Sequence, residues 1–306
     1  MILQKRFHAN GKLLIAGEYT VIDGGLALAV PTRYGQSLQV DSYSSSHPTL
    51  NWEAYLVDQS LWFEAQFDLK NLEILQTSHE KFAQKLQEIL RAIEELNPNF
   101  FKNSEESFRC KTQLEFPQNW GLGSSSTLIY LLAKWADVDE FSLSDLTFKT
   151  SGYDIACAGH DTPILYQNTS QGRMIREIEF NPPFLDQLAL VYLNQKQDTQ
   201  VGVSKHYKSK PKNEELINSI THIVRQILEV QTLVDFENLM EKHEMLLSEH
   251  LEIRPVKERL FSDYKGAVKS LGAWGGDFVL ITKRSDYKNY FRLNGYSTLL
   301  QFTDVI

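Results

Sequence analysis

The chain has 306 residues, of which 42% are hydrophobic and 11% aromatic, enough to form one large or two medium domains with a buried core. Its formal net charge of −8 argues against general binding to nucleic acid or to an anionic membrane. It shows neither a long apolar run nor a signal-peptide pattern, and its two cysteines are too few for a disulfide framework. We therefore expect a cytoplasmic protein without nucleic-acid or membrane partners.

The first part of the chain is predicted to form strands. Apolar runs at residues 12–16 and 26–30 are separated by a glycine turn signal, and residues 36–70 are rich in β-prone residues. Residues 79–96 then place their apolar side chains at helical spacing, and an Asn-Pro pair follows, so this segment predicts a helix. Residues 111–116 alternate as a short strand.

A second region is predicted to begin near Pro182. In chain order we expect a buried strand, two amphipathic helices, a further short helix and another strand, followed by a final helix with an edge strand. The first five of these elements are expected at residues 188–193, 213–233, 235–251, 256–269 and 278–282. This order favours a mixed α+β fold with two lobes, which we place at residues 1–180 and 181–306.

The most informative segment is residues 117–126, Pro-Gln-Asn-Trp-Gly-Leu-Gly-Ser-Ser-Ser, which precedes an apolar helical run. Glycine at 121 and 123 allows a backbone path in which consecutive N–H groups point at one anion. A helix that begins at Ser124 or Ser125 adds the positive end of its dipole, and the serine hydroxyls can cap it or bind phosphate or magnesium. The segment predicts a phosphate cradle, and a serine-capped turn without a ligand is the alternative.

Two common phosphate motifs are excluded by the residues present. A Walker loop requires Gly-Lys followed by Ser or Thr, and the only Gly-Lys pair, Gly11-Lys12, is followed by Leu13. A dinucleotide fingerprint requires a third glycine at the position of Ser126. The predicted cradle is therefore of another type.

Three other short segments carry chemically useful residues. Residues 11–25 place Lys12 and Glu18 beside a turn, and residues 150–156 contain an aspartate that follows a glycine. Residues 272–277 form a glycine-rich turn before a strand. Taken singly, each has a plain structural interpretation, namely a solvated strand end, a helix N-cap and a strand-leading turn.

Together the four segments resemble the motifs of the GHMP small-molecule kinases. Residues 117–125 resemble the ATP loop Pro-x-x-x-Gly-Leu-Gly-Ser-Ser, and residues 11–18 resemble the first motif, Gly-Lys-x-x-x-x-Gly-Glu. Residues 151–156 resemble the segment Ser-Gly-x-Asp-x-Ala, and residues 272–277 resemble the third motif, in which Trp274 replaces a family glycine. The resemblance implies an α+β fold with a left-handed βαβ unit in the N-terminal lobe, a ferredoxin-like C-terminal lobe, and ATP and its acceptor between the lobes.

The resemblance also implies roles for individual residues. Lys12 and Asp154 would be catalytic and face the acceptor, and Ser125 would help to bind magnesium. The ATP-binding residues would be Gly121, Leu122, Gly123, Ser124, Ser125, Ser126, Gly275 and Gly276. A second acidic metal ligand is expected before the aspartate segment, with Asp139, Glu140 and Asp145 as equal candidates. The expected cofactors are therefore ATP and Mg²⁺.

The acceptor is predicted from finer details that resemble the phosphomevalonate kinase branch. These are Tyr19 after the Gly-Glu pair, Cys157 after the aspartate segment, Asp277 at the end of the third motif, and a loop at residues 195–204. The substrate-binding residues would be Glu18, Tyr19, Lys196, Ser204 and Asp277. We expect a monomer or homodimer that phosphorylates phosphomevalonate in isoprenoid precursor synthesis. Mevalonate or another sugar or alcohol is the alternative acceptor, and an inactive ATP-binding protein of the same fold is the non-enzyme alternative.

Two further signals are discounted. His243-Glu244 begins like a metalloprotease helix, but Leu247 stands where the second histidine is required. We therefore predict that His243 and Glu244 lie on a solvated helix face. Cys157 is predicted to be a small buried residue rather than a nucleophile.

Overall fold

The computed structural model describes residues 3–101, 106–195, 203–274 and 276–306, and it divides into two compact units that alternate along the chain. Strands β1 (Leu3–Ala16) and β2 (Ala27–Ser44) each contribute residues to both units. The lobe boundary expected near residue 180 remains a prediction. The first unit comprises Met1–Gly11, Tyr34–Gln118 and Gly123–Gly159, and the second comprises Lys12–Arg33, Asn119–Leu122 and His160–Ile306.

The first unit is built on a mixed sheet. Besides parts of β1 and β2, its strands are β3 (Thr49–Tyr55), β4 (Leu61–Asp68), β5 (Ile74–Thr77) and β6 (Glu106–Leu114). The strand order is β5-β4-β3-β6-β2, in which β3 and β6 are parallel and the other neighbours antiparallel. Parallel neighbours need a long connection. Here it is supplied by β4, β5 and the helix that follows them.

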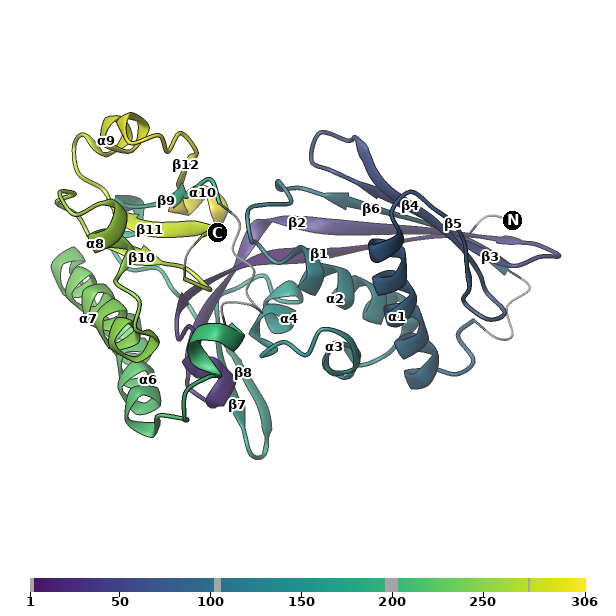
Figure 1. The fold of residues 1–306 in the computed structure, drawn as a ribbon, viewed down its shortest axis with the longest axis horizontal. Helices are drawn as coiled ribbons and strands as arrows, with labels where there is room; N and C mark the ends of the chain where they lie inside the picture. Colours follow the sequence, from purple (N-terminus) through teal and green to yellow (C-terminus); the bar gives the residue numbers. More distant parts are fainter. Residues whose placement is uncertain (1–2, 102–105, 196–202, 275) are drawn as a thin grey trace. The chain divides into compact units, whose positions relative to one another are not determined.

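One face of this sheet carries the helices of the unit. They are α1 (Glu80–Leu96), α2 (Ser124–Ala136), α3 (Glu140–Thr147) and α4 (Tyr153–Ala158). Alternate residues of β3 are buried, so its apolar side chains, such as Trp52, project from one face and form a core with helix residues such as Leu90 and Leu132. Figure 1 shows the four helices together on that side. The strands expected within 36–70 and the helix at 79–96 are confirmed.

The second unit contains the hairpin β7 (Ile164–Thr169) and β8 (Gly172–Glu177), which pairs with the start of β2, and a separate antiparallel sheet. The strands of that sheet are β9 (Leu188–Tyr192), β10 (Val268–Ser270), β11 (Phe278–Thr282) and β12 (Leu299–Gln301). Its helices are α6 (Glu214–Glu229), α7 (Leu233–Leu251), α8 (Val256–Leu260), α9 (Tyr287–Leu293) and α10 (Phe302–Val305). The short helices are η1 (Thr20–Asp23), η2 (Leu185–Gln187) and η3 (Val203–Tyr207).

The separate sheet has the topology expected for the C-terminal part of the chain. The chain passes from β9 through α6 and α7 to β10 and β11, and then through α9 to β12. The spatial order is β10-β11-β9-β12, so the first and third strands of this group lie in the middle. A β-α-β-β-α-β unit with this order is ferredoxin-like, and the expectation is confirmed. No helix of the described ranges is long and apolar enough to cross a lipid bilayer.

The helix predicted at residues 256–269 is wrong for most of its length. It ends at Leu260, and Val268 to Ser270 form β10 instead. Gly266 explains the change, because a Cβ at this position would lie 2.4 Å from the backbone oxygen of Thr282. The chain must approach β11 closely at this point, which a helix would prevent. The strands at 188–193 and 278–282 and the two long helices between residues 213 and 251 are confirmed.

Candidate functional site

The glycine-serine loop leads directly into α2, which begins at Ser124. Gly121 has a φ of 67° and Gly123 a φ of 94°, values that glycine adopts without the strain of a side chain. None of the side chains that the structure describes caps the first turn of α2. The N–H groups at the start of a helix lack partners within the helix, so this turn is suited to an anion.

The serines of this turn differ in their surroundings. Ser126 is buried, and its hydroxyl donates a hydrogen bond of 2.8 Å to the carbonyl oxygen of Gly123. Ser125 is exposed, and Ser124 is half-buried. The Ser126 hydroxyl therefore stabilises the turn, while the Ser125 hydroxyl is accessible to a ligand. Their roles in binding ATP and magnesium remain predictions.

In the second unit, Lys12 and Asp277 both lie against Gly121. The Lys12 Nζ donates a hydrogen bond of 2.9 Å to the carbonyl oxygen of Gly121, and its backbone N–H donates one of 2.9 Å to Leu122. A Cβ at Gly121 would lie 2.4 Å from the Asp277 carboxyl group, so the close approach requires glycine. The cavity beside them holds only about 10 Å³, about the space of one water molecule. The structure thus brings together residues of the first motif, the loop and the third motif.

The third-motif turn is held by backbone contacts and by the first motif. Asp277 has a φ of 56°, and its N–H donates a hydrogen bond of 2.6 Å to the carbonyl oxygen of Gln195. Trp274, which replaces a family glycine, is buried, and its backbone N–H donates a hydrogen bond of 2.9 Å to the Tyr19 hydroxyl. Gly276 is buried in the same turn. Gly275 and Lys196 lie outside the described residues.

Tyr19 also contacts the short helix η3, which carries Ser204. The ring centroids of Tyr19 and Tyr207 are 5.6 Å apart, and the Tyr207 hydroxyl donates a hydrogen bond of 2.7 Å to Asp23. Burial raises the pKa of Tyr19 to about 12, so its hydroxyl stays protonated at neutral pH. Ser204 is exposed on η3. Substrate binding by Ser204 and Tyr19 remains a prediction.

A buried ion cluster, which we define as Glu18, His243, Glu244 and Lys269, lies in the second unit. Each of the four residues is at most 3% exposed. The Lys269 Nζ donates a hydrogen bond to Glu18 Oε1, and His243 Nε2 lies 3.2 Å from Glu18 Oε2. Glu244 Oε1 accepts a hydrogen bond of 3.2 Å from the backbone N–H of Ser270. Glu18, predicted to bind substrate, is thus paired inside the unit, and its predicted role is not tested by this contact.

The prediction that His243 and Glu244 lie on a solvated helix face is wrong. Both belong to the buried side of α7, together with Phe236, Met240, Leu247 and Leu251. Residues three or four apart share one face of a helix, so this spacing is the signal that places the polar pair in the core. The prediction of a solvated face rested on the polarity of the two residues and not on their spacing.

Burial and charge set the protonation of the cluster. Burial raises the pKa of Glu244 to about 8 and lowers the pKa of His243. Burial alone would also raise the pKa of Glu18, but Lys269 and His243 outweigh it and lower this pKa to about 2. At neutral pH the cluster therefore contains one ion pair, a neutral imidazole and a carboxylic acid that keeps its proton.

Glu244→Gln is expected to change how stability depends on pH. Because the pKa of Glu244 rises on folding from 4.5 to about 8, the unfolded chain releases this proton first, and the wild type loses stability as pH rises between these values. Glutamine cannot ionise, so the variant should gain stability relative to the wild type by up to about 1.4 kcal/mol per pH unit in this range. Urea unfolding from pH 5 to 9 measures the difference. If the free energy of unfolding depends on pH in the same way in both proteins, the raised pKa of Glu244 is contradicted. The lowered pKa of His243 has the opposite effect on stability, but it is common to both proteins and cancels in the comparison.

Asp154 lies in the first unit, at the second position of α4. Gly152 is the N-cap residue, so Asp154 does not have the capping role that was its alternative. Its Oδ1 accepts a hydrogen bond of 3.0 Å from the Thr150 hydroxyl, and its side chain is half-buried. Helix α4 packs against α2 within this unit. The two helices that carry Asp154 and Ser125 therefore contact each other, and both begin after a glycine in the left-handed region.

Two of the proposed acidic metal ligands already have other roles. Asp139 caps α3 by accepting a hydrogen bond of 2.7 Å from the N–H of Ser142, and Glu140 lies 3.2 Å from the Lys134 Nζ. Within the described ranges, no group of three or more His, Cys, Asp or Glu residues could hold a metal ion by itself. Magnesium usually takes one or two carboxylates and completes its shell with water and substrate phosphates, so the Ser125 hydroxyl would supply only part of its shell.

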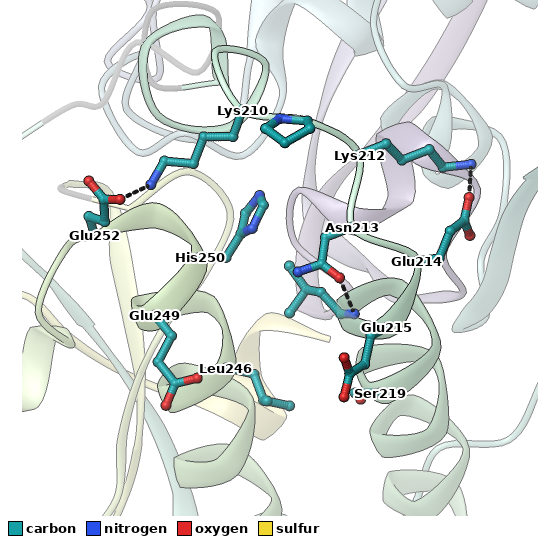
Figure 2. Close-up of a pocket in the computed structure, with 12 residues that line it drawn as sticks. Lys210, Lys212, Asn213, Glu214, Glu215, Ser219, Leu246, Glu249, His250 and Glu252 are labelled. Carbon is teal, nitrogen blue, oxygen red and sulfur yellow. Dashed lines mark hydrogen bonds and ion pairs between the residues drawn. The ribbon is translucent and has the colours of Figure 1, made fainter.

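The largest of the cavities that we describe lies elsewhere in the second unit, between the end of α7 and the start of α6 (Figure 2), with a volume of about 650 Å³. Its lysines are paired, Lys210 with Glu252 and Lys212 with Glu214, each at 2.8 Å. Asn213 accepts a hydrogen bond from the N–H of Leu216 and so caps α6. None of the predicted site residues lines it. We therefore place the candidate site at the glycine loop and its partners.

The structure is similar to solved kinases over almost its whole length. The mevalonate kinase of Methanococcus jannaschii has a TM-score of 0.69 and 18% identity, with 97% of each chain covered. The phosphomevalonate kinase of Streptococcus pneumoniae in complex with phosphomevalonate and AMPPNP has a TM-score of 0.64 and 17% identity, with 95% of each chain covered. A Lactococcus lactis galactokinase complexed with galactose has a TM-score of 0.60 and 13% identity, covering 95% of this chain and 88% of its own. No protein-family model and no curated protein matches the sequence.

Proposed function

From the GHMP kinase fold that the chain has, we propose that it is an ATP-dependent kinase of a small molecule. The observation that carries the proposal is the contact of Lys12 and Asp277 with Gly121, in the loop that leads into α2. Three motifs that are far apart in the sequence meet at this glycine. The lysine on its carbonyl and the carboxyl group against its Cα place two charged groups beside the loop.

ATP is proposed to bind with its phosphates at the loop and at the start of α2. The residues proposed to contact it are Gly121, Leu122, Gly123, Ser124, Ser125, Ser126, Gly275 and Gly276. Backbone N–H groups would hold the phosphate oxygens, and the helix dipole would favour their negative charge. The Lys12 ammonium, which holds the Gly121 carbonyl, adds positive charge beside the loop. This support is electrostatic and does not depend on the acceptor.

Magnesium is the proposed second cofactor. The exposed Ser125 hydroxyl is an oxygen ligand of the kind that this ion prefers. When bound, the ion would neutralise charge on the transferred phosphoryl group. Its further ligands would be phosphate oxygens and water.

The proposed reaction is an in-line transfer of the γ-phosphoryl group. An acceptor oxygen forms the new bond to phosphorus while the bond to the β–γ bridging oxygen breaks, and ADP leaves. An alcohol acceptor loses its proton, and Asp154 would take it. A phosphate monoester is largely dianionic at neutral pH, so in that case Asp154 would position and polarise the acceptor. Lys12 is proposed as the second catalytic residue, which would stabilise negative charge on the transferred phosphoryl group.

The leading acceptor is phosphomevalonate, with mevalonate or another sugar or alcohol as the alternative. Structures with the same fold include kinases whose names give each of these acceptors. Tyr19 and Asp277, two of the details that favour phosphomevalonate, lie in the turns beside the loop. Glu18, Ser204 and Lys196 are proposed to contribute to the same acceptor site. Isoprenoid precursor synthesis would be the setting of that reaction.

The test measures ADP release in the presence of ATP and Mg²⁺ with phosphomevalonate, mevalonate, galactose or homoserine. We expect saturable ADP release with phosphomevalonate, above the rate without acceptor, and at least about tenfold higher kcat/KM than with the others, a difference of about 1.4 kcal/mol in transition-state binding. Higher activity with another acceptor would replace the substrate but keep the kinase. Binding of ATP without turnover of any acceptor would favour the inactive alternative and overturn the proposal.

A further inference from the structure

The buried ion cluster contains more ionisable side chains than a stable core requires. Glu18, His243, Glu244 and Lys269 are each at most 3% exposed. Removing charged groups from water is costly, and well-packed apolar residues often stabilise a core as well as a buried ion pair does. Buried polar contacts can instead hold segments in one defined arrangement, because each group has few partners that satisfy it. The role of the cluster is therefore to be sought in the segments that it connects.

The cluster joins three segments of the second unit. Glu18 belongs to the turn after β1, His243 and Glu244 to α7, and Lys269 to β10. Besides its bond to Glu18, the Lys269 ammonium donates a hydrogen bond of 2.9 Å to the carbonyl oxygen of Ser270. His243 Nε2 also accepts a hydrogen bond of 3.2 Å from the N–H of Gly17. Helix α7 thus holds both the first-motif turn and the end of β10 by directional contacts.

Both of the segments held in this way lead to the candidate ATP site. On one side, Tyr19 follows Glu18 in the sequence. The Tyr19 hydroxyl accepts a hydrogen bond of 2.9 Å from the backbone N–H of Trp274. On the other side, the chain runs from Ser270 into the turn that contains Trp274 and ends at Asp277, whose carboxyl group lies against Gly121. The turn from residue 271 to residue 274 is therefore fixed at its start by Glu244 and at its end by Tyr19.

We propose that His243, Glu244 and Lys269 are positioning residues of the ATP site: through Glu18 and Ser270 they hold the third-motif turn, and with it Asp277, against Gly121 of the glycine loop. The inference rests on the proposed function, because it assigns these contacts to nucleotide binding. None of the three side chains has to touch the nucleotide. Glu244 is the most informative member, since its carboxyl group accepts the hydrogen bond from the N–H of Ser270 in β10.

The first test measures binding of AMPPNP with Mg²⁺ by calorimetry at pH 7, below the temperature at which any variant unfolds. Glu244→Ala removes the acceptor for the N–H of Ser270, and we expect the Kd to rise at least about tenfold, which is about 1.4 kcal/mol. Glu244→Gln retains an oxygen acceptor of nearly the same shape and should restore the Kd to within about threefold, under 1 kcal/mol. The control is Leu247→Ala, which removes a buried side chain from the same helix outside the cluster. It should lower the Tm and leave the Kd unchanged.

The second measurement is hydrogen exchange of the peptide covering residues 271–274, without nucleotide. Glu244→Ala should accelerate exchange of the Trp274 amide, and Leu247→Ala at an equal loss of Tm should not. If Glu244→Ala does not fold, His243→Gln is measured in both assays, with the same expectation. An unchanged Kd with unchanged exchange, or an equal change in Leu247→Ala, overturns the inference. If the wild type does not bind AMPPNP, the proposed function is overturned, and the exchange data still decide whether the cluster holds the turn.

Discussion

Replacing Lys269 with methionine is expected to lower the free energy of unfolding by about 3–5 kcal/mol, the usual cost of removing one partner of a buried ion pair. Glu18 would remain in the core, where both it and Lys269 are 1% exposed. The carboxylate must then be buried without its cation or take up a proton, because the low pKa of Glu18 depends on Lys269. Urea unfolding at pH 7, fitted with one slope for both proteins, measures the difference.

Two further variants show whether this loss comes from burial of an unpaired charge. Lys257→Met breaks the exposed pair with Glu241, at 2.8 Å, and should cost less than about 1 kcal/mol. Adding Glu18→Gln to Lys269→Met removes the stranded charge and should recover more than half of the loss. Lys269→Met alone could instead lower the free energy of unfolding by less than about 1 kcal/mol, no more than the loss of an exposed pair. That result would show that the ion pair in the cluster is not essential for stability.

Replacing Asp154 with asparagine is expected to lower kcat/KM for the preferred acceptor by about 10²–10⁴, the range for a positioned proton-transfer group. The variant keeps an oxygen that can accept the hydrogen bond of Thr150, so α4 should keep its position. A phosphate acceptor, which needs no base, should place the loss near the lower end of this range. Initial rates of ADP release at saturating ATP measure the effect.

The matched control for this prediction is Asp58→Asn, in the exposed turn between β3 and β4 of the same unit. Its Oδ1 accepts hydrogen bonds within that turn, from the N–H and hydroxyl of Ser60, at 3.0 and 2.6 Å. Its kcat/KM should equal that of the wild type. If Asp154→Asn loses less than about tenfold, or about 1.4 kcal/mol, Asp154 is not the catalytic group.

Local signals in the sequence predicted the parts of the candidate site that depend on neighbouring residues. Glycines at 121 and 123 and the apolar run after them predicted the turn and the start of α2, because positive φ values and helix propensity are local properties. The contact of Asp277 with Gly121 was not predicted by any local pattern, since it joins residues far apart in the chain.

The sequence could not predict the buried ion cluster, because the charged residues that pair in it are far apart in the sequence. Glu18 and Lys269 are separated by 251 positions, and neither has a neighbour in sequence that indicates its partner. Lys269 was also assigned to the wrong element, a helix instead of β10. Only His243 and Glu244 carried a usable local signal, the regular spacing of buried residues on α7.

The alternation of the two compact units along the chain has a consequence for synthesis. The first unit is complete once residue 159 has left the ribosome, whereas the strand segments at residues 12–33 belong to a unit whose last strand ends at Gln301. At about 5–20 residues per second, the 268 residues from Arg33 to Gln301 take roughly 13–54 s to synthesise, and for that time these apolar segments, which contain Leu14 and Leu28, wait for the unit to be complete. During that interval the apolar side chains of these segments lack the complete core of the second unit.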